Sequence, residues 1–365
     1  MSERESKKMS LCFFICAAVF LGGVALVVYL ADPFFHYHEP WFGLAAVQDE
    51  KEYQVPGGVE HLDYDSVLVG SSVTMSMNTD ILNERFDCMT IKAVGNAAGA
   101  PVLNYYLNLA FESRDLKYVF YGLDVFSFYN DPDMNVVPED VEYLINKNPL
   151  DDVQYLWNGE IIGRKIPDMI RISRCGNYTW GMVYNFNQYG VCGPDGVLAG
   201  YTPTSQDVVE QYPYDYQSDY VMENLERLEN VVREHPETQF VFFVPPYPIL
   251  WWDRAYSQGT LSTYEYTLKE TLKCLLAYEN VDIYTTHFND ATLITDMYQY
   301  MDIIHGGPSV TEMMVQEVGN PDTQITLENY EAQVDALMEI EDAFHNKVVN
   351  EGYGFVYEAG GMKME

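Results

Sequence analysis

The sequence predicts an α/β protein: a three-layer α/β/α domain around a mainly parallel sheet, preceded by one N-terminal transmembrane helix. Three observations support this prediction: an uncharged apolar stretch at residues 9–30, short apolar runs that end near Gly or Pro, and amphipathic segments between those runs. Short, fully apolar runs are typical of buried parallel strands, and their alternation with helices places helices on both faces of the sheet.

The N-terminal segment predicts a membrane anchor. Residues 9–30 carry no charge, and as a helix they would extend about 33 Å, enough to cross the hydrocarbon core of a bilayer. We expect a cytoplasmic tail at 1–8 and an uncleaved single-pass helix at 9–31. The alternative is a signal peptide, whose apolar region is usually shorter. Basic residues precede the stretch, so the positive-inside rule keeps the N-terminus in the cytoplasm and exports the remainder.

The charge balance excludes one class of partner. The chain has 20 Lys and Arg against 55 Asp and Glu, a formal net charge of −35. Such a chain repels phosphate backbones, so we expect no nucleic-acid partner. The hydrophobic share of 48% is large enough for a sizeable core.

The α/β pattern follows a connector at 32–62. We assign residues 63–350 to one extracytoplasmic domain and 351–365 to a tail. Strands are expected at 66–69, 89–94, 117–123, 239–244 and 281–284, and helices at 102–112, 219–234, 263–278 and 326–349. Ser218 is expected to be a helix N-cap. The interval 126–217 breaks the alternation, and we interpret it as an insertion with one helix near 152–172.

The cysteines leave disulfide bonding open. Cys12 and Cys16 lie in the apolar stretch, where cysteine is ordinary apolar filler. The exported part, where disulfides can form, contains Cys88, Cys175, Cys192 and Cys274. Four cysteines allow three complete pairings. Cys175 and Cys192, which flank a loop rich in Gly, Asn and aromatic residues, are the favoured pair.

The first candidate site residues follow the first strand, because ligands of such sheets bind at the carboxyl ends of the strands. Gly70, Ser71 and Ser72 form a strand-to-helix turn. A serine on this kind of turn presents its hydroxyl beside a backbone N–H that can stabilise an oxyanion, which suits a nucleophile. The alternative is a helix N-cap, a routine role of serine.

The second candidate is the pair Asp302 and His305, in a loop after the last strand bounded by Gly and Pro. An Asp can hold the imidazole of a His by its Nδ1–H and leave Nε2 as a general base. Asp342 and His345 have the same spacing, but they lie in the last amphipathic helix. There we expect an ion pair on the helix surface.

Two further turns follow the second and third strands. In the turn from Gly95 to Gly99, small residues let a substrate approach the backbone. The N–H of Gly99 is a candidate oxyanion donor, and Asn96 is a further candidate in the same turn. Gly122 lies at the end of the third strand, and Asp124 follows it.

Taken in this order, these residues resemble the sequence blocks of the SGNH/GDSL hydrolase superfamily: an early Gly-x-Ser, a second block with Gly, a third with Gly-x-Asn and a late Asp-x-x-His. The resemblance covers roughly residues 63–305. It implies Ser72 as nucleophile, Asp302 and His305 as its triad partners, and oxyanion donors at Ser72 and Gly99. Asp124 stands where the superfamily has Asn. A carboxylate cannot donate a hydrogen bond, so we expect Asp124 outside the oxyanion hole.

The single anchor, the Gly-Ser-Ser turn and Pro245-Pro246-Tyr247 resemble exported bacterial members of the superfamily, including teichoic-acid D-alanylation and alginate-acetylation proteins. This implies a serine esterase that removes or transfers a small acyl group, acetyl above all, on a cell-surface glycan, with no metal or organic cofactor. One alternative is an acyltransferase component that works with a membrane-bound O-acyltransferase. Another is a non-catalytic envelope scaffold, which Asp124 favours and the retained triad disfavours.

Aromatic residues after the fourth strand are candidates for substrate binding. Tyr247 and Trp251 are of a type that stacks on sugar rings, and the alternative is packing in the core or a lid. The 30 tyrosines of the chain are only a hint of a carbohydrate surface.

Overall fold

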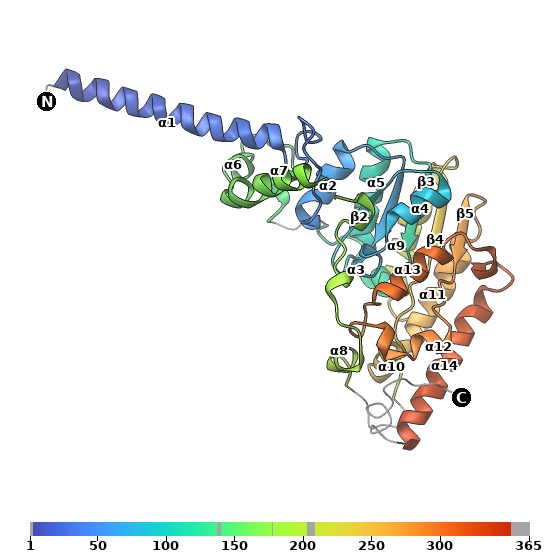
Figure 1. Cartoon of the computed structure of the whole chain (residues 1–365). Coiled ribbons are helices and arrows are strands. Elements are labelled where there is room, and N and C mark those ends of the chain that lie inside the picture. The colour runs from blue at the N-terminus through green and yellow to red at the C-terminus, as the bar shows by residue number, and fades with distance from the viewer. Residues whose placement is uncertain (1–2, 137–139, 177, 203–208, 352–365) are drawn as a thin grey trace. The chain divides into compact units, whose positions relative to one another are not determined.

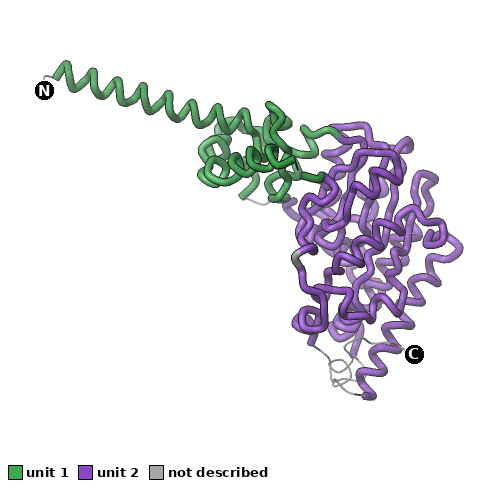
Figure 2. The backbone as a smooth tube through the Cα atoms, viewed as in Figure 1, with its two compact units in different colours: residues 1–63, 137–179 green, residues 64–136, 180–365 purple. Residues whose placement is uncertain are grey.

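The computed structural model describes residues 3–136, 140–176, 178–202 and 209–351 (Figure 1). The chain divides into two compact units (Figure 2). Unit 1 contains residues 1–63 and 137–179, and unit 2 contains residues 64–136 and 180–365. The predicted tail lies outside the described residues from residue 352 onward, as do three short parts of the predicted insertion.

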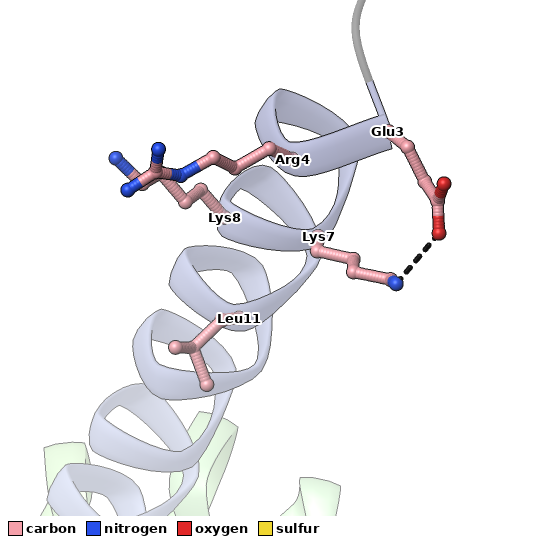
Figure 3. A pocket seen from close by; sticks show the side chains of 5 residues that line it. All are labelled: Glu3, Arg4, Lys7, Lys8 and Leu11. Carbon is pink, nitrogen blue, oxygen red and sulfur yellow. Dashed lines mark hydrogen bonds and ion pairs between the residues drawn. The ribbon is translucent and has the colours of Figure 1, made fainter.

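Unit 1 begins with one long apolar helix, α1 (Glu3–Ala31). Its length and composition are sufficient to cross a membrane. Figure 3 shows the basic side chains on its first turns, where Lys7 Nζ lies 2.6 Å from Glu3 Oε1. The uncharged stretch predicted to span a bilayer is therefore helical throughout.

The remainder of unit 1 packs around the end of α1. Its helical segments are α2 (Lys51–His61), η2 (Glu142–Leu144), α6 (Val153–Leu156), the π-helical turn η3 (Ile161–Lys165) and α7 (Ile166–Cys175). Its core contains Val28, Ala31, Phe34, Tyr143, Leu144, Tyr155, Ile161 and Ile166. The single helix expected near 152–172 is thus three segments. Pro167, which has no N–H to donate, lies at the start of α7, where the π-helical turn ends.

Unit 2 contains a six-stranded sheet with the order β2-β1-β3-β4-β5-β6. Its strands are β1 (Ser66–Gly70), β2 (Thr90–Val94), β3 (Tyr118–Gly122), β4 (Gln239–Phe243), β5 (Val281–Tyr284) and β6 (Gln324–Ile325). The first five pair in parallel and β6 pairs antiparallel to β5. The five predicted strands are confirmed. β6 has two residues, too few to give a period-2 pattern.

Helices cover both faces of this sheet, as predicted. Leu68, Phe120 and Val241 are neighbours in register on one face, and they pack against α4 (Thr79–Phe86) and α13 (Pro308–Glu317). Helices α5 (Ala100–Ser113), α9 (Ser218–Glu234) and α11 (Leu261–Leu275) pack together, with α5 against β1 and β2. The α-helices of unit 2 are α3 (Ser72–Met75), α4 (Thr79–Phe86), α5 (Ala100–Ser113), α8 (Pro194–Ala199), α9 (Ser218–Glu234), α10 (Ile249–Ser257), α11 (Leu261–Leu275), α12 (Ala291–Ile294), α13 (Pro308–Glu317) and α14 (Tyr330–Glu351).

Two sequence predictions about this fold are wrong. Ser218 is the first residue of α9, and its N-cap is Gln217, which makes no side-chain capping bond. All six cysteines are free thiols, so the favoured Cys175–Cys192 disulfide is absent. Cys175 ends α7 in unit 1, whereas Cys192 lies beside Gly307 in unit 2.

Candidate active site

The candidate site lies at the carboxyl ends of the parallel strands. The chain leaves β1 to one neighbour, β2, and returns on the other side to form β3. In sheets of this kind the point where the strand order reverses is a common ligand site, because the loops diverge there and leave a crevice. Ser72 follows β1 and Asp124 follows β3, so both sequence motifs lie at this point.

Two glycines shape the turn that carries the serine. A Cβ on Gly70 would lie 2.2 Å from Thr74 Oγ1, and a Cβ on Gly122 would lie 2.3 Å from Thr74 Cγ2. The Thr74 side chain therefore occupies space that both glycines leave open at the ends of β1 and β3. Thr74 Oγ1 donates to the carbonyl of Ser71 at 3.0 Å, which tightens the turn.

The two serines of the turn have different partners. Ser71 is the N-cap of α3, and its Oγ accepts a hydrogen bond from the N–H of Val73 at 3.2 Å. The capping role proposed as the alternative for this motif therefore belongs to Ser71. The Oγ of Ser72 is left for another contact, and it lies 2.8 Å from Nε2 of His305.

The contact continues through the imidazole to a carboxylate. Nδ1 of His305 lies 2.8 Å from Oδ2 of Asp302. An ionised carboxylate only accepts, so Nδ1 carries the proton, and in the neutral ring Nε2 accepts from the Ser72 hydroxyl. The structure thus brings Ser72, His305 and Asp302 together as one hydrogen-bonded chain across 233 positions of sequence.

The loop that holds His305 is fixed by its own hydrogen bonds. Oδ1 of Asp302 accepts from the N–H groups of Ile304 and His305, each at 2.8 Å. Partial burial acts to raise the pKa of Asp302, but the hydrogen bonds from His305 and Ile304 outweigh it and hold the pKa below its ordinary value. Asp302 therefore stays ionised at neutral pH and can orient the imidazole.

The N–H groups expected to stabilise an oxyanion are available. Ser72 begins α3 and Gly99 is the N-cap of α5. Neither N–H donates a hydrogen bond to a residue that the structure describes. Gly95 N–H donates to Gly70 O at 3.2 Å, which ties the turn containing Gly99 to the serine turn. The third expected donor, Asn96, is exposed on that turn.

The structure adds an amide that the sequence analysis missed. A Cβ on Gly99 would lie 2.4 Å from Cγ and from Oδ1 of Asn130, so the Asn130 side chain lies directly against Gly99. The fully buried Asn224 holds this segment in place, because its Nδ2 donates to the carbonyls of Phe128 at 3.0 Å and Asn130 at 2.8 Å. Nothing in the sequence near Asn130 signals this contact.

Asp124 lies inside the protein. It is fully buried, and the hydroxyl of Tyr247 donates to its Oδ1. Burial raises the pKa of Asp124, while Ser71 and Tyr247 act in the opposite direction. Asp124 is the N-cap residue of the 3₁₀ helix η1 (Val125–Tyr129), but its side chain makes no capping bond.

The aromatic residues expected to bind substrate are also buried. Tyr247 is 1% exposed and Trp251 is 4% exposed, and their rings stack with centroids 4.7 Å apart. Neither ring presents a face to solvent on which a sugar could stack. The structure therefore supports core packing, the alternative interpretation, and corrects the assignment of these two residues to a substrate surface.

A buried lysine connects the serine helix to the histidine. Lys92 in β2 is 1% exposed, and its Nζ donates to the carbonyls of Met75 at 2.8 Å and Val183 at 2.9 Å. Three residues beyond Val183, the Phe186 ring meets the His305 ring edge-on at 5.2 Å. Burial lowers the pKa of Lys92 to about 7, and the nearby Asp80 acts in the opposite direction.

The pair expected on the surface of the last helix is different in the structure. Asp342 is exposed, but His345 is buried, and its Nδ1 lies 2.7 Å from Oδ1 of Asp253 in α10. The helical spacing predicted the wrong partner, because the interior-facing carboxylate comes from another helix. Within the described residues, one cluster of side chains could bind a metal ion, and it consists of Asp253, Glu341 and His345. It contains none of the residues around Ser72.

No protein-family model matches the chain, and no curated protein matches it.

Proposed function

We propose that the protein is a membrane-anchored, extracytoplasmic serine esterase that removes or transfers a small acyl group, acetyl above all, on a cell-surface glycan. The observation that carries this proposal is the chain from Ser72 Oγ to His305 Nε2 and from His305 Nδ1 to Asp302 Oδ2, each link 2.8 Å long. A serine hydroxyl activated in this way is the nucleophile of acyl transfer on several unrelated folds.

In the proposed reaction, Ser72 Oγ attacks the acyl carbon and its proton passes to Nε2 of His305. Asp302 remains ionised and stabilises the imidazolium. The N–H groups of Ser72 and Gly99 donate to the negative oxygen of the tetrahedral intermediate. When the intermediate collapses, the bond to the glycan oxygen breaks and His305 returns the proton to it. Water or an acceptor hydroxyl then attacks the acyl-serine by the same route.

Helix α1 and the charge pattern support the proposed cellular location. The helix has the length and composition to cross a bilayer, and its first turns carry Arg4, Lys7 and Lys8. Under the positive-inside rule, a chain with this basic flank keeps its N-terminus in the cytoplasm and exports the remainder, which supports an outward-facing site. Protease added to intact spheroplasts should digest the chain after Ala31. Complete protection of that region would contradict the orientation.

Hydrolysis and transfer share these residues and differ only in the acceptor. A component that passes acyl groups to a polymer together with a membrane-bound O-acyltransferase would form the same acyl-serine. The full-length protein in nanodiscs should release acetate from an O-acetylated glycan, and added hydroxyl acceptors should divert that acetate into transferred product. Failure to turn over any acyl ester would favour the non-catalytic scaffold.

A further inference from the structure

A second cluster of titratable side chains lies away from Ser72, between helices α10 and α14. It consists of Asp253, Glu341 and His345, which are 1%, 2% and 5% exposed. Glu341 and His345 are four residues apart in α14, so they share one face of that helix. Charged groups are costly to bury unless they are paired or bind a metal ion, so this cluster requires an explanation.

The protein chain satisfies only part of the cluster. Asp253 Oδ1 lies 2.7 Å from Nδ1 of His345, and its Oδ2 accepts from the hydroxyl of Tyr201. Oε1 of Glu341 and Nε2 of His345 are buried without a hydrogen-bond partner among the described residues. Leaving two such atoms unsatisfied would cost stability, so a group from outside the chain is expected to contact them.

The charges indicate what kind of group this is. Two carboxylates meet here, and in the described part of the chain no Lys or Arg forms an ion pair with either. A water molecule could satisfy the two free atoms but would bring no positive charge to the two carboxyl groups. A cation does both.

The positions of the donor atoms suit a metal ion. One ligand atom from each of the three residues lies within 4.8 Å of the others. Two ligands of a tetrahedral zinc ion lie about 3.3 Å apart, so side-chain rotations that move the ligand atoms by about 1 Å bring them to that spacing. The His345–Asp253 contact also matches a common feature of metal sites, in which a carboxylate holds one ring nitrogen of a histidine and the other nitrogen binds the ion.

We propose that this cluster is a structural site for a divalent transition-metal ion of the zinc type. Nε2 of His345 and the carboxylate of Glu341 bind the ion, Asp253 orients the imidazole and adds a second negative charge, and water completes the coordination. A mixed set of imidazole and carboxylate ligands favours zinc over magnesium or calcium, which prefer oxygen alone. This site is independent of the proposed esterase activity.

The test uses full-length protein without a polyhistidine tag, in detergent or nanodiscs. After dialysis against EDTA, Tm is measured with and without ZnCl2, and bound metal is counted by inductively coupled plasma mass spectrometry. We expect about one zinc per chain, and a rise in Tm of about 3–6 °C when zinc exceeds its Kd about a hundredfold. Both measurements are made on the wild-type protein, so the test does not depend on whether a variant folds.

Two variants on adjacent positions locate the ion. Glu341→Gln removes a ligand and should abolish the zinc-dependent rise in Tm, whereas the exposed Asp342→Asn should retain it. MgCl2 in place of ZnCl2 should give no rise. The proposal is overturned if zinc does not stabilise the EDTA-treated wild type, if Glu341→Gln responds as strongly as wild type, or if magnesium acts as well as zinc.

Discussion

Two Asp–His pairs in unit 2 have nearly the same contact and different surroundings. His305 Nδ1 lies 2.8 Å from Asp302, and His345 Nδ1 lies 2.7 Å from Asp253. The His305 side chain is 22% exposed and its Nε2 contacts the Ser72 hydroxyl, whereas the His345 side chain is 6% exposed and its Nε2 has no partner among the described residues. An Asp–His pair therefore specifies no chemistry by itself. The group that faces Nε2, and access to that group, decide its role.

The largest expected effect comes from breaking the exposed pair at its serine. Ser72→Ala and His305→Ala should each lower the turnover of an aryl acetate at least about 10³-fold, because nucleophile and base act as one unit. For the same reason the double variant should be no worse than either single variant. His287→Ala, at a half-exposed histidine paired with Glu317, is the matched control and should keep wild-type turnover. Activity that survives Ser72→Ala would refute the assignment.

The next effect concerns the N–H groups proposed to hold the oxyanion formed at Ser72. Gly99→Ala places a methyl group where Asn130 lies, so the turn must move and its N–H must shift from the oxyanion. Loss of one such donor typically costs about 10²–10³ in turnover, and steady-state kinetics should show a loss of this order. Gly159→Ala meets open space and should change nothing. Equal behaviour of the two variants would remove Gly99 from the site.

Removing the carboxylate from the His345 pair should mainly lower stability, whereas removing it from the His305 pair should mainly lower activity. Asp253→Ala leaves both His345 and Tyr201 without their buried partner, a kind of change that costs about 3–5 kcal/mol. Asp302 is 44% exposed, so Asp302→Ala should affect folding less. In thermal melts and aryl acetate assays, Asp253→Ala should show the larger fall in Tm and Asp302→Ala the larger fall in turnover. The reverse order would contradict the comparison.

The buried Lys92 adds a pH dependence. Its pKa is lowered to about 7 in the folded protein by burial, while the unfolded chain keeps the proton up to about 10.5. Between these values the unfolded state binds more protons, so this group makes the protein more stable as pH rises. The change in Tm from pH 7 to pH 9 should therefore be more positive in wild type than in Lys92→Met. Identical pH profiles would show that the amine is solvated.

The smallest effect is expected at Asp124. The carboxyl group is buried with Tyr247, and burial raises its pKa, so a neutral amide of the same shape fits there. Asp124→Asn should leave aryl acetate turnover within about tenfold of wild type, far from the change expected for an oxyanion donor. A hundredfold rise would show that the native site lacks a donor, and a hundredfold fall at unchanged Tm would reveal a catalytic role.

Much of the fold and the central contact could be predicted from sequence because their signals are local. The five parallel strands are short apolar runs, and Ser72, Asp302 and His305 stand at turns marked by glycine. Positions 70 and 122 are glycines because a Cβ at either position would clash with the Thr74 side chain. The sequence alone shows only that small residues occur there. Strand ends meet at one edge of a parallel sheet, so residues placed there could be expected to meet.

The remaining contacts join residues that are far apart in sequence and leave no local pattern. Lys92 reaches the carbonyl of Val183, 91 positions away, and His345 pairs with Asp253, 92 positions away, although Asp342 has the spacing of a helical pair. Helix spacing shows which residues share a face, but the partner that covers that face depends on packing between helices. The burial of Tyr247 and Trp251 likewise depends on packing around them and has no signal in the residues themselves.

The most direct test of the central claim is covalent labelling of the nucleophile. The full-length protein is treated with a fluorophosphonate, which reacts with activated serine hydroxyls, and the modified peptide is identified by mass spectrometry. The account predicts one label per chain, on Ser72, that is lost in Ser72→Ala and in His305→Ala and retained in His287→Ala. Wild-type protein that stays unlabelled, or a label on another serine that persists in His305→Ala, would contradict it.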